Sequence, residues 1–137
     1  MAPAMITSTT AALARLPTLV SGLLLVSEAD HPFTVVRLGQ LSESELPRAL
    51  PSAPNGAAEP ERVELEAFFA RGATAQAYHT ESDRSLVERF RALVSFFRCE
   101  LGNARVYRVG AIEVDVYALG QSLEGEWLGV ASKLIET

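Results

Sequence analysis

Few side chains in this sequence could serve as the base of a nucleophilic catalyst. The only histidines are His31 and His79, and the single cysteine is Cys99. Nucleophilic catalysis needs a nucleophile, a base and a group that orients the base. We expect both histidines in exposed loops, and Cys99 on a helix as a partly buried, inert thiol. The pattern therefore predicts a protein that is not an enzyme.

Acidic residues offer two further candidates for chemistry. Glu28, Asp30 and His31 could bind a hard metal ion, but their spacing is weakly specific and no second ligand cluster accompanies them. Glu113 and Asp115 share one face of a predicted strand and could form a carboxylate pair, although an exposed sheet face explains them better. We therefore predict no intrinsic metal site and no cofactor.

The net charge and the apolar segments limit the partners. The chain has 17 acidic and 12 basic residues, for a formal charge of −5. This charge argues against direct nucleic-acid binding, which needs Lys and Arg to neutralise phosphates, and it suits a basic protein partner. No apolar stretch is long enough for a membrane span. The apolar segment 16–26 could pass for that of a signal peptide, but no basic residue lies between Met1 and Ala14, and Glu28 stands where small cleavage-site residues are expected. We therefore predict a cytoplasmic protein.

Length and composition predict a single domain over residues 1–137. Apolar residues make up 48% and charged residues 21%, which is ordinary globular usage. A chain of this length buries a core without disulfides or metals. Four prolines and an Asn-Gly pair fall within residues 40–60, so we predict a long loop there, inside the one domain.

Helices are expected mainly in the first two thirds. Residues 7–10 offer capping hydroxyls, residues 11–16 are good helix formers, and Pro17 should end or kink that helix. A short helix is predicted over 67–71. A long helix should begin after Thr80 and end at Gly102-Asn103. One face of it carries the apolar residues Leu86, Phe90, Leu93, Val94, Phe97 and Leu101.

Strands are predicted over 23–26, 33–38 and 62–66, and then over 105–109, 112–119 and 127–135 as an antiparallel meander. In the middle strand of the meander, even-numbered apolar residues point to one face, and Glu113, Asp115 and Tyr117 point to the other. The pattern predicts an α+β fold with helices packed on a largely antiparallel sheet.

The strand pattern continues to the last residues, from Lys133 to Thr137. Chain ends usually fray. A terminus paired into a sheet would instead hold the hydroxyl and carboxylate of Thr137 in fixed positions. An incidental end just beyond an edge strand is the alternative.

Two long segments resemble the nuclease A inhibitor family. One is GLLLVSEADHPF over residues 22–33, and the other is VYRVGAIEVDVY over 106–117, continuing as GVASKLIET over 129–137. Between them, Phe68-Phe69-Ala70-Arg71 and Gln76-Ala77-Tyr78 fall in the family's order and spacing. The resemblance covers nearly the whole chain from about Thr9 and is weakest across residues 40–60.

The resemblance implies a fold and an activity. The fold is a three-layer α/β/α sandwich with a mixed, largely antiparallel sheet, like that of the plant pathogenesis-related proteins. The activity is inhibition of a sugar-nonspecific, Mg²⁺-dependent DNA/RNA endonuclease of the ββα-metal type. The inhibitor fills the nuclease active site in a one-to-one complex, and the Mg²⁺ belongs to the nuclease. We expect the free protein to be a monomer.

The resemblance also assigns contact residues. Thr137 matches the terminal threonine whose hydroxyl approaches the nuclease metal, and Glu28 matches a glutamate that pairs with a basic nuclease residue. Gln76 and Tyr78 fall in a loop that contacts nuclease arginines, and Tyr78 replaces a tryptophan while keeping an aromatic ring for stacking. Ala77 stands where the family has an aspartate. This departure motivates an alternative function, a non-inhibitory protein-interaction module on the same fold with a different partner.

Overall fold

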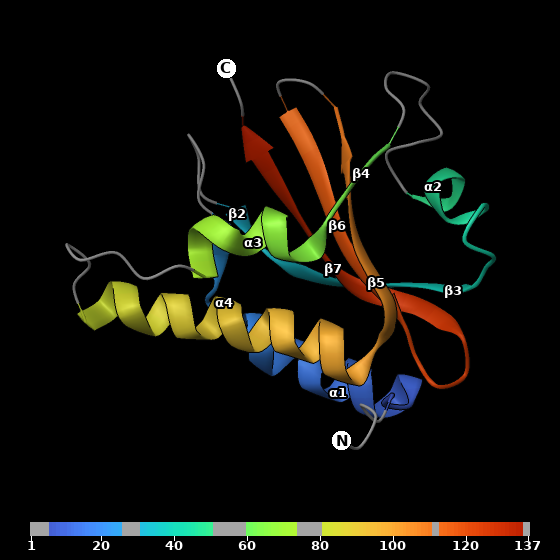
Figure 1. Cartoon of the computed structure of the whole chain (residues 1–137), viewed down its shortest axis with the longest axis horizontal. Coiled ribbons are helices and arrows are strands. Elements are labelled where there is room, and N and C mark those ends of the chain that lie inside the picture. The colour runs from blue at the N-terminus through green and yellow to red at the C-terminus, as the bar shows by residue number, and fades with distance from the viewer. Residues whose placement is uncertain (1–5, 26–30, 51–59, 74–80, 111–112, 136–137) are drawn as a thin grey trace.

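The computed structural model describes residues 6–25, 31–50, 60–73, 81–110 and 113–135 (Figure 1). Its main element is a five-stranded sheet with the order β3-β7-β6-β5-β4, in which every neighbouring pair is antiparallel. The strands are β3 Thr34–Gln40, β4 Glu61–Val63, β5 Gly102–Val109, β6 Glu113–Gln121 and β7 Glu126–Ile135. The predicted meander is thus confirmed as β5-β6-β7.

A separate two-stranded hairpin precedes β3. It consists of β1 Leu24–Leu25 and β2 His31–Pro32, which are also antiparallel. The described strands therefore contain no parallel pair, and the sheet is antiparallel where the resemblance implies a mixed one.

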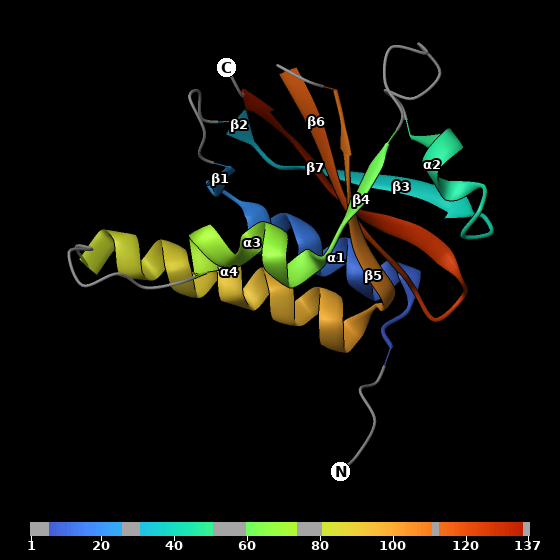
Figure 2. The same cartoon turned by 45° about the horizontal axis from the view of Figure 1, so that its top comes forward.

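Three helices cover one face of the sheet (Figures 1 and 2). They are α1 Thr9–Val20, α3 Leu65–Ala73 and α4 Glu81–Glu100. On the opposite face the described helix is the four-residue α2, Leu46–Ala49. The α+β class is confirmed, while a complete third layer stays a prediction. Within the described residues, no helix is long and apolar enough to cross a membrane.

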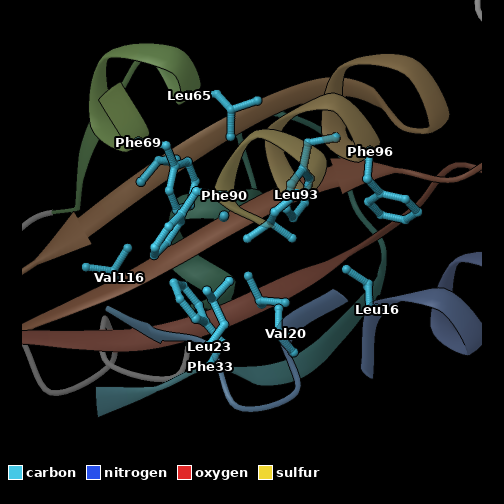
Figure 3. Packing of buried hydrophobic residues seen from close by; sticks show 14 of the residues in the cluster. Leu16, Val20, Leu23, Phe33, Leu65, Phe69, Phe90, Leu93, Phe96 and Val116 are labelled. Atoms are coloured by element: carbon cyan, nitrogen blue, oxygen red, sulfur yellow. The ribbon is translucent and has the colours of Figure 1, made fainter. Parts of the chain in front are cut away.

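The larger core lies between the three helices and the sheet (Figure 3). Val114, Val116 and Ala118 of β6 contribute to it, as their alternation predicted. The apolar spacing of α4 is likewise confirmed by the buried residues Phe90, Leu93, Phe97 and Leu101. Phe96 is buried as well, which widens the apolar face of this helix.

A second cluster covers part of the other face. Leu46 and Leu50 pack there against the side chains of the sheet residues Tyr107, Val109, Tyr117, Leu119 and Trp127. Tyr117 is therefore buried, although it alternates with the polar positions of β6. The exposed face expected for β6 is found only toward its start, where the side chain of Glu113 is 68% exposed.

Of the two outcomes predicted for Pro17, the helix does not end there: α1 continues to Val20, whose side chain is buried. Other element boundaries differ from the sequence prediction. Strand β3 continues through Gly39 to Gln40, because a bulge and a positive φ of 86° at Gly39 let the chain resume its pairing.

The other differences fall around α3 and β5. Strand β4 ends at Val63, because Leu65 begins α3. Strand β5 begins at Gly102 directly after α4, and Asn103 takes the predicted left-handed conformation with φ 53°. The predicted cap Thr80 and the strand start Ile112 lie outside the described residues.

Candidate functional site

The last part of β7 is held by the sheet along one side. The ladder between β6 and β7 continues to the pair Glu113–Ile135, whereas the last described pair between β3 and β7 is Thr34–Ala131. Residues 132–135 therefore extend beyond β3 while β6 keeps them in register. This is the strand that leads toward Thr137.

Lys133 adds an ionic contact on the same side. Its Nζ lies 3.0 Å from Oε1 of Glu113 and 3.9 Å from Oδ1 of Asp115. The hydrogen bond with Glu113 raises the pKa of Lys133, and the charges of Glu113 and Asp115 add to this effect. The two carboxylates considered for catalysis thus share one ammonium group, which is the arrangement of a surface ion-pair network rather than of an acid–base pair.

The β1–β2 hairpin, between whose strands Glu28 falls, is anchored in the core at both of its ends. Leu23, just before β1, is fully buried, and Phe33, just after β2, is 7% exposed. Both side chains point into the helix-covered core (Figure 3). The burial fixes where the chain enters and leaves this hairpin.

Ser132 connects the hairpin with the end of β7. Its Oγ donates to the backbone oxygens of His31 and Pro32, at 3.2 and 3.0 Å. Strand β2 accordingly lies beside the C-terminal part of β7 in both views (Figures 1 and 2). Sequence reasoning gave Ser132 no role. The available signal was a hydroxyl in the otherwise apolar row Leu128, Val130 and Leu134.

A group of phenylalanines joins the base of the hairpin to two helices. The ring centroid of Phe33 lies 6.4 Å from that of Phe69 in α3 and 6.3 Å from that of Phe90 in α4. Phe69 and Phe90 are 6.1 Å apart (Figure 3). Aromatic pairs at these separations stabilise beyond their burial alone. The same two helices flank the segment that contains Gln76 and Tyr78.

All four predicted contact residues, Glu28, Gln76, Tyr78 and Thr137, lie outside the described residues, and so does Ala77. The structure describes the elements that flank them. The β1–β2 hairpin, the C-terminal end of β7 and the C-terminal end of α3 lie toward the same side of the molecule in both views (Figures 1 and 2). The contacts of the four residues themselves stay a prediction.

The expectation for Cys99 was wrong, because this thiol is exposed. Successive residues of an α-helix are about 100° apart, so Cys99 lies about 200° around α4 from the buried Phe97. Its Sγ is 3.9 Å from Oγ of Ser95, on the side of the helix away from the core. The spacing of the apolar residues in α4 was sufficient to predict that Cys99 lies away from the buried face.

Metal-binding groups are sparse in the described part of the chain. No group of three or more histidine, cysteine, aspartate or glutamate side chains there could hold a metal ion. Of the three residues considered as metal ligands, only His31 is described, in β2, and Glu28 and Asp30 lie outside the described residues. His79 also lies outside the described residues.

The described residues define an α+β domain in which a hairpin and a strand end meet at one side. A family model described as nuclease A inhibitor-like protein matches residues 10–137. Because this match covers nearly the whole chain, the protein belongs to the nuclease A inhibitor-like family. Membership implies a nuclease inhibitor, and therefore a nuclease as its partner. No curated protein matches the chain significantly in sequence.

Proposed function

We propose that this protein inhibits a sugar-nonspecific, Mg²⁺-dependent DNA/RNA endonuclease of the ββα-metal type by occupying its active site one-to-one. The observation that carries the proposal is the family match over residues 10–137. The formal charge of −5 supports it, because a nuclease cleft that binds phosphates is basic.

The terminal threonine has the chemistry that such a site accepts. A nonspecific nuclease site offers basic side chains and a hard cation. Mg²⁺ prefers oxygen ligands in an octahedral shell, and the side chain of Thr137 carries a hydroxyl oxygen. A hydroxyl is not a phosphodiester, so the nuclease has no bond to cleave. Thr137 would thereby compete with substrate near the metal, which belongs to the nuclease.

Three further side chains complete the proposed contact. Glu28 would pair with a basic residue of the nuclease, and Gln76 and Tyr78 would contact its arginines. Glutamate and glutamine oxygens accept hydrogen bonds from a guanidinium, and a tyrosine ring stacks on its flat face.

The flanking elements favour a rigid presentation of these residues. β6 and Lys133 hold the strand that leads to Thr137, and the core holds the base of the hairpin. Elements that are ordered before binding lose less conformational entropy when they dock. A competitor of substrate therefore gains affinity from this scaffold.

The test is a plasmid-cleavage assay with a purified ββα-metal nuclease, a fixed Mg²⁺ concentration and increasing amounts of the protein. We expect cleavage of both DNA and RNA to stop at a one-to-one ratio. The protein alone, with Mg²⁺, should hydrolyse neither nucleic acid nor simple esters. Undiminished cleavage at a large molar excess would contradict the proposal.

Ala77 supports one alternative, an interaction module on the same fold with a different partner. The family has an aspartate at this position, so the chain lacks an anionic group there. The variant Ala77→Asp separates the two functions. Inhibition that appears only in Ala77→Asp would favour the alternative, whereas inhibition by the native chain supports the first proposal.

A further inference from the structure

One side chain joins the two elements that lead to Glu28 and Thr137. The Oγ of Ser132 lies 3.0 Å from the carbonyl oxygen of Pro32 and 3.2 Å from that of His31. A serine hydroxyl has a single proton, so the two acceptors share one donor. The contact spans 100 or more positions in the sequence, because β2 and the end of β7 meet only in the fold.

The backbone at this position explains why a side chain is needed. The pairing of β3 with β7 ends at Thr34–Ala131, one residue before Ser132. Pro32 has no N–H, so it cannot donate to a neighbouring strand. The carbonyl oxygens of Pro32 and His31 accept from the Ser132 hydroxyl. The serine hydroxyl supplies the donor where the regular ladder stops.

The neighbouring ion pair between Lys133 and Glu113 does not connect the hairpin to β7. Lys133 points to the other face of β7 and bonds Glu113 on β6. It therefore fixes the strand within the sheet, but it does not connect the strand to the hairpin. The hydrogen bonds of Ser132, by contrast, join β2 to β7.

We infer that Ser132 is a positioning residue for nuclease inhibition, because it fixes the hairpin that bears Glu28 relative to the strand that bears Thr137. This inference rests on the proposed function. His31 is three residues after Glu28, and Ser132 is five residues before Thr137. A link so close to both lets the two groups approach the nuclease as one unit, which reduces the ordering that binding must impose.

The experiment compares Ser132→Ala, which removes the hydroxyl, with Ser132→Thr, which keeps it. Thr34→Val is the matched control, because Thr34 also donates a hydroxyl to a backbone oxygen of β7, that of Ala131 at 3.4 Å, but from a strand already paired to it. Each variant is characterised by its inhibition constant, its unfolding midpoint and the hydrogen exchange of the amides of His31, Phe33 and residues 133–135.

We expect Ser132→Ala to weaken inhibition by about 3- to 10-fold, the range for one lost hydrogen bond. Amide exchange should accelerate at β2 and at the end of β7 only. Ser132→Thr should restore inhibition to within about 2-fold, and Thr34→Val should leave it unchanged.

Full inhibition by Ser132→Ala, or equal losses in Ser132→Ala and Ser132→Thr, would overturn the inference. A failure of the proposed function itself is distinguishable. It shows as absence of inhibition by the native chain, whatever the hydrogen exchange of the variants.

Discussion

The two halves of β7 have different surroundings. In the first half, Trp127 and Leu128 are fully buried, and the strand is paired with β3 on one side and β6 on the other. In the second half, residues 132–134 are only half-buried, and the ladder to β6 alone continues. Strand β7 thus runs from the hydrophobic core to a half-buried part of the surface.

Trp127 shows how firmly the first half is fixed. Its Nε1 donates to the backbone oxygen of Leu41 at 2.8 Å. The guanidinium of Arg105 lies 5.1 Å from the centre of its ring, and that buried arginine also pairs with Glu43. The segment around α2 is therefore fastened to the sheet by polar contacts in addition to Leu46 and Leu50.

The residues that stabilise β7 and the residues that lead toward Thr137 therefore lie in different halves of the strand. The buried half sets the register of the strand. The half-buried part inherits this register through β6 and Ser132, without contributing much apolar burial. Substitutions in the first half should change the free energy of unfolding, and substitutions near the end should change binding.

The largest expected effect is that of Trp127→Ala on folding. Removing a fully buried tryptophan should lower the free energy of unfolding by about 3–5 kcal/mol. Chemical denaturation measures it. Trp127→Phe keeps most of the volume but loses the donor to Leu41, so it should lower the free energy of unfolding by less. Comparison of inhibition per folded molecule should show no change, and a large loss there would mean that the two halves are not separable.

The next largest effect is expected at Thr137, where a substitution should change inhibition and leave folding unchanged. Thr137→Val keeps the β-branched shape and removes the hydroxyl, so it should weaken inhibition by about 1–3 kcal/mol, the cost of a lost buried polar contact. The unfolding midpoint should stay the same, and Thr137→Ser should recover most of the affinity. Appending two or three residues should be worse. If an extended chain inhibits as well as the native one, Thr137 is not in the nuclease site, and Glu28 and the segment of Gln76 and Tyr78 would make the main contact.

Acidification should lower the stability of the folded protein, because it protonates Glu124, the carboxylate that precedes β7. Its Oε1 accepts a hydrogen bond from the backbone N–H of Thr9 at 2.7 Å, at the N-terminus of α1. This bond lowers the pKa of Glu124. A pKa that is lower in the folded state than in the unfolded one contributes stability above the unfolded value, and this contribution is lost as the pH falls through the folded pKa.

The measurement is the thermal midpoint between pH 7 and pH 3. Glu124→Gln should have a lower midpoint at pH 7 than the native chain and a smaller decline on acidification. Glu88→Gln, which changes an exposed carboxylate of α4, is the control. An identical acid dependence in Glu124→Gln and the native chain would assign the loss of stability to other carboxylates, such as Glu126 with its partner Arg37.

The smallest effect is expected at the ion pair between Glu113 of β6 and Lys133 in the second half of β7. Glu113→Gln removes the nearer partner of Lys133, but these side chains are 68% and 38% exposed. Exposed ion pairs contribute little because water and salt screen them. The inhibition constant should change by less than about 2-fold. A loss as large as that of Ser132→Ala would show that the ionic contact, rather than the serine, fixes the end of the strand.

The elements could be predicted where the local pattern was strong. The alternation of Val114, Val116 and Ala118 gave the core face of β6, and the spacing of Phe90, Leu93 and Phe97 gave that of α4. Family resemblance gave the nuclease inhibitor assignment. The boundaries around Gly39 and Leu65 were missed, because a bulge or a helix start depends on what the next element packs against.

Local patterns thus predicted the class of fold and the antiparallel meander, and the resemblance predicted the family. Three contacts became visible only once the elements were packed together. Tyr117 is buried beneath the segment of α2, Glu124 bonds the first turn of α1, and Ser132 joins the hairpin to β7. Helix and strand periods are set by neighbours a few residues apart, so the sequence displays them directly. A contact such as Ser132 with His31 joins positions 101 residues apart, and no local preference specifies which distant carbonyl a hydroxyl will meet until the strands are packed.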